Sequence, residues 1–174
     1  LSLPGDLYRF DGVRFVRWPV PPGPSGKVLA DSAGGLWVTA GELVHLKKGV
    51  VASHFELAGT HGFQSISEDP EGTVWVGLRG EDAPLCSASD HGVKCFGKND
   101  GLPLSEINAV LPDGSGGLWL GGSTALVRWN RGGVSETYPV KAFISSLART
   151  PDGTLWVGLF EEGPGLGLQQ LRDG

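Results

Sequence analysis

The sequence lacks the features that usually mark nucleic-acid-binding and membrane-spanning chains. Its 14 Lys and Arg residues are outnumbered by 19 Asp and Glu residues, and they form no basic cluster that could follow a phosphate backbone. No apolar run approaches the roughly 18 to 20 residues that span a bilayer, and the first residues do not resemble a signal peptide. We therefore expect no nucleic-acid partner and no membrane contact within this segment.

Methionine is absent, even from the first position, so we interpret the chain as a segment of a longer protein. Common catalytic motifs are also missing: there is no H-E-x-x-H, no G-x-S-x-G, no phosphate-binding loop and no dinucleotide fingerprint. The four histidines have no metal-ligand spacing, and Ser115 lies in a Gly-rich turn rather than in a protease motif. We expect no catalytic residue, no metal and no cofactor.

Glycine is abundant, with 29 residues in 174 and no collagen-like period, and this indicates many tight turns. One phrase returns four times: AGGLWVT at 33–39, EGTVWVG at 71–77, SGGLWLG at 115–121 and DGTLWVG at 152–158. Six residues before each Trp stands an Asp, except that the last copy has Thr150. The spacing of about 40 residues is typical of a four-stranded propeller blade.

The third repeat shows four strands most clearly, at 107–111, 118–121, 125–130 and 134–138. Asp and Gly fill the first turn because Asp bonds its own backbone and Gly accepts positive φ. The fold class is therefore an all-β propeller of four-stranded antiparallel blades, with about four and a half blades of a larger, seven-bladed ring. We expect a partial blade at 7–18, blades at 28–55, 63–96 and 107–138, and a partial blade at 143–171.

Residues 99–130, NDGLPLSEINAVLPDGSGGLWLGGSTALVRWN, resemble the two-component regulator propeller repeat. The matching positions are Gly101, Leu102, Pro103, Val110, Asp113, Gly116, Leu118, Trp119, Gly121, Leu126 and Arg128, with Ala125 where the pattern has Gly. The other copies match mainly at the Trp phrase. This resemblance implies an extracytoplasmic sensor region of a bacterial histidine kinase, hybrid two-component regulator or diguanylate cyclase.

The four tryptophans that recur in register are expected in the core between blades, because a large apolar ring suits burial between neighbouring sheets. The alternative is a ligand-stacking role. The set consists of Trp37, Trp75, Trp119 and Trp156.

The loops divide the propeller into two unlike faces. One face repeats short Asp-Gly turns, whereas the other collects unequal links between blades and turns between second and third strands, which is typical of a functional surface. Each polar residue there can also be a solvated loop residue. The candidate ligand-binding residues, near the channel mouth, are His61, Arg79, Glu81, Asp82, Asn99, Asp100, Glu161 and Glu162.

Arg79 is the first choice among these residues, because its guanidinium could meet a carboxylate or a sugar hydroxyl. The alternative is an ion pair with Glu81 or Asp82.

The two cysteines flank a predicted two-residue turn, so Cys86 and Cys95 would be directly opposed in a non-hydrogen-bonded pair. That separation suits a disulfide and an oxidising compartment such as the periplasm; two free core thiols are the alternative.

The predicted function is a non-enzymatic sensor module that binds a small molecule, such as a carbohydrate, or a partner domain and relays the signal to an output domain. Its partners would also include the remaining blades, or a second chain, that close the ring. Two alternatives remain open: a propeller enzyme similar to streptogramin lyase, and a scaffold that docks other domains.

Overall fold

The computed structural model describes residues 7–21, 25–57, 62–80, 82–89, 91–161, 163 and 166–171. Three complete sheets contain β3 (Ser25–Ala30), β4 (Leu36–Ala40), β5 (Leu43–Lys47) and β6 (Val50–Phe55); β7 (Phe63–Glu68), β8 (Val74–Leu78), β9 (Leu85–Ser89) and β10 (Gly92–Phe96); and β11 (Ala109–Pro112), β12 (Leu118–Gly121), β13 (Ala125–Asn130) and β14 (Gly133–Pro139). They are flanked by the hairpin β1 (Leu7–Phe10) and β2 (Phe15–Trp18) and by the sheet β15 (Ile144–Arg149), β16 (Leu155–Leu159) and β17 (Leu168–Leu171).

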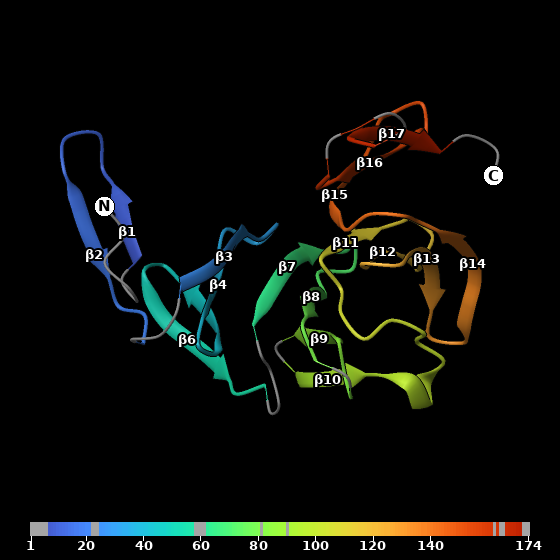
Figure 1. Cartoon of the computed structure of the whole chain (residues 1–174). Coiled ribbons are helices and arrows are strands. Elements are labelled where there is room, and N and C mark those ends of the chain that lie inside the picture. Colours follow the sequence, from blue (N-terminus) through green and yellow to red (C-terminus); the bar gives the residue numbers. More distant parts are fainter. Residues whose placement is uncertain are drawn as a thin grey trace.

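The strands of each sheet follow chain order and pair antiparallel, which is the topology of a propeller blade. Figure 1 shows the sheets side by side in an arc, with the first strands β3, β7, β11 and β15 on its concave side. The prediction of an all-β propeller is confirmed. β11 begins two residues later than predicted, and the link before it contains a 3-10 turn, η1 (Lys98–Asp100).

Each pair of neighbouring sheets encloses its own hydrophobic cluster. Trp37 packs with residues of β8 between the first two complete sheets, Trp75 packs with Trp129 between the next two, and Trp119 packs with Ile144 of β15. These rings are 3%, 4% and 9% exposed, whereas Trp156 is only half-buried. The described chain has no further sheet against Trp156, so the burial of this position depends on the next blade.

The Asp of each repeat organises the turn between the first two strands. Asp69 Oδ1 accepts hydrogen bonds from the backbone N–H groups of Glu71 and Thr73, at 3.1 and 2.8 Å, and Gly72 has a φ of 80°. Asp31 and Asp113 do the same in their own turns. These bonds explain the Asp-x-x-Gly spacing as turn geometry.

Thr150 departs from this pattern because its turn uses a different acid. Its hydroxyl donates to Asp152 Oδ1 at 2.6 Å, and the same Asp152 oxygen accepts the backbone N–H of Thr154 at 3.0 Å. A carboxylate two residues further along therefore stabilises the last turn.

The Gly two residues after the Trp is explained by the next blade. A Cβ on Gly77 would collide with Ser65 of its own sheet and with the backbone of Ile107, the residue that leads into β11. Thr39 replaces this Gly in the first complete sheet, and there Gly26 leaves room for the hydroxyl, which accepts the Lys27 N–H at 2.6 Å. In both sheets, the first and second strands approach so closely at this point that only one of the two strands has room for a side chain.

No helix among the described residues is both long and apolar enough to cross a membrane.

Candidate ligand-binding site

The structure separates the predicted site residues into three places. His61, Glu81 and Glu162 lie outside the described residues. Asp82, Asn99 and Asp100 line one groove. Arg79 lies outside this groove and forms an ion pair with Glu106. Glu161 follows β16 in the last sheet. The predicted set is therefore not one continuous site among the described residues.

The groove has a volume of about 680 Å³, which is in the range of small-molecule sites. It is lined by the segment that precedes β9, by the end of β10 and by η1 with the link that follows it. Its lining residues are Asp82, Ala83, Cys95, Gly97, Lys98, Asn99, Asp100 and Ser105. Because β10 is the outermost strand of its sheet, the groove lies toward the rim of the propeller and not at the channel mouth, where we predicted it.

Local chain geometry brings the two walls of the groove together. Gly97 packs so closely against the backbone of Asp82 that a Cβ would overlap the Asp82 carbonyl oxygen. The Asp100 carboxylate accepts the Gly97 N–H at 2.9 Å, and Gly101, with a φ of 74°, ends η1. Only Gly fits both the contact at 97 and, without strain, the left-handed position at 101.

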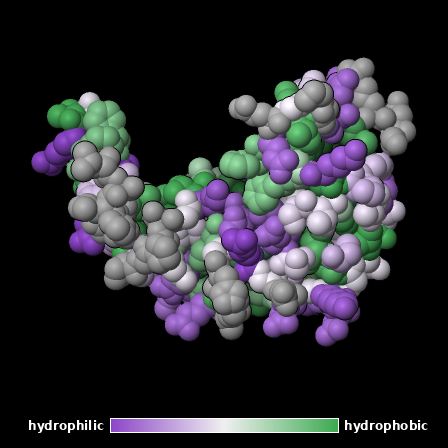
Figure 2. All heavy atoms as spheres, in the orientation of Figure 1, coloured by the Kyte–Doolittle hydropathy of each residue, from purple (hydrophilic) through white to green (hydrophobic). Residues whose placement is uncertain are grey.

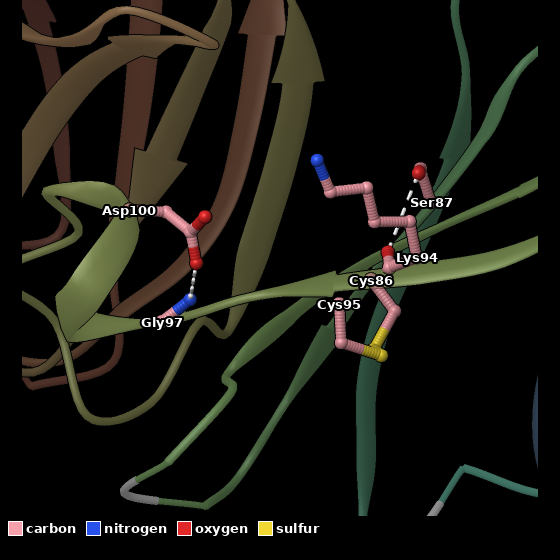
Figure 3. Close-up of a disulfide and its surroundings, with 6 residues drawn as sticks. All are labelled: Cys86, Ser87, Lys94, Cys95, Gly97 and Asp100. Carbon is pink, nitrogen blue, oxygen red and sulfur yellow. Dashed lines mark hydrogen bonds between the residues drawn. A yellow bond between two sulfur atoms is a disulfide. The ribbon is translucent and has the colours of Figure 1, made fainter.

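A disulfide braces the strand that leads into the groove. Cys86 of β9 pairs directly with Cys95 of β10, their Cα atoms are 4.0 Å apart, and their sulfur atoms are bonded. Figure 3 shows this bond one residue away from the segment in which Asp100 points at the Gly97 N–H. Cys86 is buried while Cys95 is exposed and lines the groove, so the bond anchors the groove wall to the core.

A second contact links the groove to the hydrophobic core between the second and third complete sheets. Trp129, 1% exposed, donates its indole N–H to the backbone carbonyl of Asp100 at 3.4 Å. Its ring packs edge-on against Trp75 and Phe96. η1 is therefore held by a buried aromatic cluster, which favours a preorganised site.

The groove carries polar groups of both signs. Asp82 and Asp100 contribute carboxylates, Lys98 contributes an ammonium, and Asn99 contributes an amide that is exposed to solvent. All four residues are exposed, and Asp100 also bonds the backbone of its own turn. Such a surface can bind hydroxyl, amide or amino groups of a polar ligand.

Arg79 contacts a residue that sequence analysis did not single out. Its Nε lies 3.4 Å from Glu106 Oε2, and the two residues also form an isolated β-bridge between the second and third complete sheets. Among the described residues, the partner of Arg79 is thus Glu106 and not Asp82; Glu81, the other predicted partner, lies outside them. Glu106 lies in the link before β11, and no local sequence pattern relates it to Arg79, which follows β8.

The opposite, Asp-Gly turn face holds a charged cluster that stabilises the turn. The Arg128 guanidinium lies between Asp113 and Glu136, 2.8 Å from each carboxylate. Burial alone would raise the pKa of Asp113, but hydrogen bonds from Ser115 and Arg128 outweigh it and lower the pKa to about 2. His45 occupies the corresponding place beside Asp31, at 2.7 Å. These groups support the turns, as the repeat predicts.

Among the described residues, no three His, Cys, Asp or Glu side chains gather as potential metal ligands.

No protein-family model matches the sequence, and no curated protein is similar to it. Solved structures do match. A streptogramin B lyase is 18% identical with a TM-score of 0.72, and the match covers 97% of this chain and 62% of that one. A virginiamycin B lyase from Staphylococcus aureus is 14% identical with a TM-score of 0.67, covering 97% and 63%.

The extracellular domain of a hybrid two-component system from B. thetaiotaomicron, described as putative, is 18% identical with a TM-score of 0.65. That match covers 83% of this chain and 21% of the other. The chain thus spans less than two thirds of the length of these proteins. At such identities the similarity shows the fold, which enzymes and sensor domains share: the chain has the blades of a β-propeller.

Proposed function

We propose that this chain is a non-enzymatic ligand-binding module of an extracytoplasmic sensor of the two-component regulator propeller type. The observation that carries the proposal is the groove of Asp82, Asn99 and Asp100, in which three residues chosen for their loop position meet on a braced scaffold. The repeat at 99–130, which includes part of this groove, supports the family assignment. The disulfide favours an oxidising compartment.

The ligand class that this groove favours is a small polar molecule. Its carboxylates, amide and ammonium offer both donors and acceptors, and a carbohydrate or one of its fragments presents hydroxyl groups that can use both. Relay of the signal to an output domain would require the bound ligand to contact residues outside the groove.

Ring closure is part of the same proposal. Phe10 and Phe15 are 57% and 71% exposed and lie on the face of β1 and β2 that is turned away from β3–β6. Further blades, from a longer chain or a second copy, would cover this apolar face. Light scattering on the protein distinguishes the two sources, because a second copy doubles the mass. A stable monomer would exclude the second copy.

The test is a screen of small sugars and their fragments by calorimetry, followed by substitutions in the groove. We expect Asp82→Asn and Asn99→Ala each to lower the affinity for an identified ligand about tenfold. This is the loss expected for one good hydrogen bond to a charged or polar group. Glu161→Ala is the matched control, since Glu161 is an exposed acidic residue in the loop that follows β16, in a different sheet from the groove. Undiminished binding to both groove variants would refute the site.

Two other outcomes identify the alternatives. Conversion of a bound compound, seen by mass spectrometry of the mixture, would identify an enzyme similar to the lyases. Binding of a purified output domain, with no small-molecule ligand, would identify a docking scaffold.

A further inference from the structure

A cavity lies between the third complete sheet and the last sheet, on the face formed by the Asp-Gly turns. Its volume is about 190 Å³. One wall consists of residues from β12, β13 and β14, and the other of residues from β15, β16 and β17 with the turn that joins the first two of these strands. Figure 2 shows hydrophilic and hydrophobic residues side by side where these two sheets meet in Figure 1. Among the described residues, the cavity has no lining residue in common with the groove of Asp82, Asn99 and Asp100.

The corresponding place at the preceding junction between sheets is almost closed. The cavity there has a volume of only about 10 Å³, and it is lined by Asp69 and Trp75 on one side and by Pro112 on the other. The Trp75 indole N–H donates to Asp69 Oδ2 at 2.8 Å. This indole therefore has its acceptor within its own repeat.

Trp119 has the same repeat position as Trp75, but another side chain occupies its acceptor. Asp113 Oδ2 accepts from Arg128, at 2.9 Å from Nε and 2.8 Å from Nη2. The Trp119 indole N–H has no acceptor among the described residues, and it is not one of the enclosed polar groups that lack a partner. It is therefore open to solvent, and Trp119 lines the cavity.

Arg149 supplies a cation on the opposite wall. It stands directly before the turn of its repeat, at the position that Glu68 and Pro112 hold in the two preceding sheets. Its Nη1 donates to the backbone carbonyl of Asp113 at 2.5 Å, which directs the guanidinium across the junction. No carboxylate among the described residues forms an ion pair with Arg149, and the residue is exposed. Its remaining N–H groups are therefore available to a ligand.

The carboxylates that line the cavity are already used by protein donors. Asp113 Oδ1 accepts two backbone N–H groups of its own turn, and its Oδ2 binds Arg128. Glu136 accepts from Arg128 through one oxygen and from the Tyr138 hydroxyl through the other, each at 2.8 Å. The polar groups left available are N–H donors, so a complementary ligand brings acceptor oxygens.

We propose that this cavity binds a small carboxylic acid in its ionised form. The ligand carboxylate accepts from the Arg149 guanidinium and the Trp119 indole N–H, while a short apolar part lies against Leu155 and Leu171. A planar guanidinium matches the two oxygens of a carboxylate, and Arg149 has no other carboxylate partner among the described residues. A ligand held in this way bridges the third complete sheet and the last sheet. The site does not depend on the groove of Asp82.

The experiment follows the indole N–H signals by NMR in the 15N-labelled full chain, with each signal assigned by replacing its Trp with Phe. The probes are propionate and propionamide, which have the same size and differ in charge. We expect millimolar propionate to shift the Trp119 signal and propionamide to leave it unchanged. The Trp75 signal is the internal control and should not respond, because that indole already donates to Asp69.

Two arginine variants test the ion pair. Arg149→Gln removes the charge while its amide can still donate to the Asp113 carbonyl, and we expect it to lower the affinity for propionate about tenfold or more. Arg131→Gln is the matched control, because Arg131 is an exposed residue of the turn after β13 and does not line the cavity. We expect its affinity to be unchanged. An unchanged Trp75 signal in each variant shows that the fold is retained.

Three results would overturn the proposal: a Trp119 signal that does not respond to propionate, an equal shift with propionamide, or equal affinities of the two arginine variants. A response of the Asn99 side-chain amide without one at Trp119 would also overturn it. That response would support the groove of Asp82, so the two proposals fail separately.

Discussion

Trp119 and Trp156 occupy the same repeat position and differ in what covers them, so truncating each to Ala measures the contribution of the neighbouring blade. Trp119 packs against Ile144 and its cluster, with the Arg128 guanidinium 5.6 Å from the centre of its ring. Trp156 is half-buried on the last sheet.

The expected magnitudes follow from the buried area. A Trp side chain buries about 150 to 250 Å², which at roughly 25 cal/mol per Å² is worth about 4 to 6 kcal/mol. Partial collapse of the cavity reduces the loss, so we expect Trp119→Ala to cost about 3 to 5 kcal/mol. Because Trp156 is only partly buried, Trp156→Ala should cost less than Trp119→Ala.

The assay is urea unfolding followed by circular dichroism, which does not depend on the removed fluorophore. The free energy of unfolding is obtained from the midpoint and slope for each variant. Equal losses in the two variants, or an unchanged midpoint for Trp119→Ala, would refute the reasoning that the next blade supplies the burial. In a longer protein with a following blade, the loss at Trp156 should rise toward that at Trp119.

Three further predictions concern the disulfide, the turn acid and the inter-blade glycine. Reduction of the Cys86–Cys95 bond should lower the free energy of unfolding by about 2 to 3 kcal/mol, which is the loop-closure value for a span of this length. Mass spectrometry of unreduced peptides from exported protein should find the two cysteines joined. Two alkylated thiols in folded protein would contradict this. The pKa of Asp113 is lowered from 3.8 to about 2 in the fold, so its contribution of about 2 kcal/mol should be present above pH 3.8 and be lost as the pH falls toward 2. Asp113→Asn should abolish that component of an acid titration of stability, and an unchanged acid profile would argue against the pairing. Gly121→Ala should destabilise by about 1 to 3 kcal/mol, because the new Cβ would overlap the Ile144 side chain, and thermal unfolding with an unchanged midpoint would show that the blades can separate at no cost.

The repeat made the fold predictable because each blade uses local chemistry. Asp69 and Asp113 bond the backbone within their own turns, and a short turn sets the opposition of Cys86 and Cys95. Such features depend on residues close in sequence, so a pattern of a few letters contains them. The exception at Thr150 also has a local reason, in the carboxylate of Asp152.

Contacts between blades are different, because they join residues that no local pattern relates. The chain order alone placed Arg79 and Asp82 on one face, but only the packing of loops put Asp82 beside Asn99 at the rim and Arg79 beside Glu106. The sequence by itself determined the blades and their turns, since hydrogen bonds within a turn act over a few residues. The tertiary structure decided which loop residues meet, and how deeply each Trp is buried, since both depend on the neighbouring sheet.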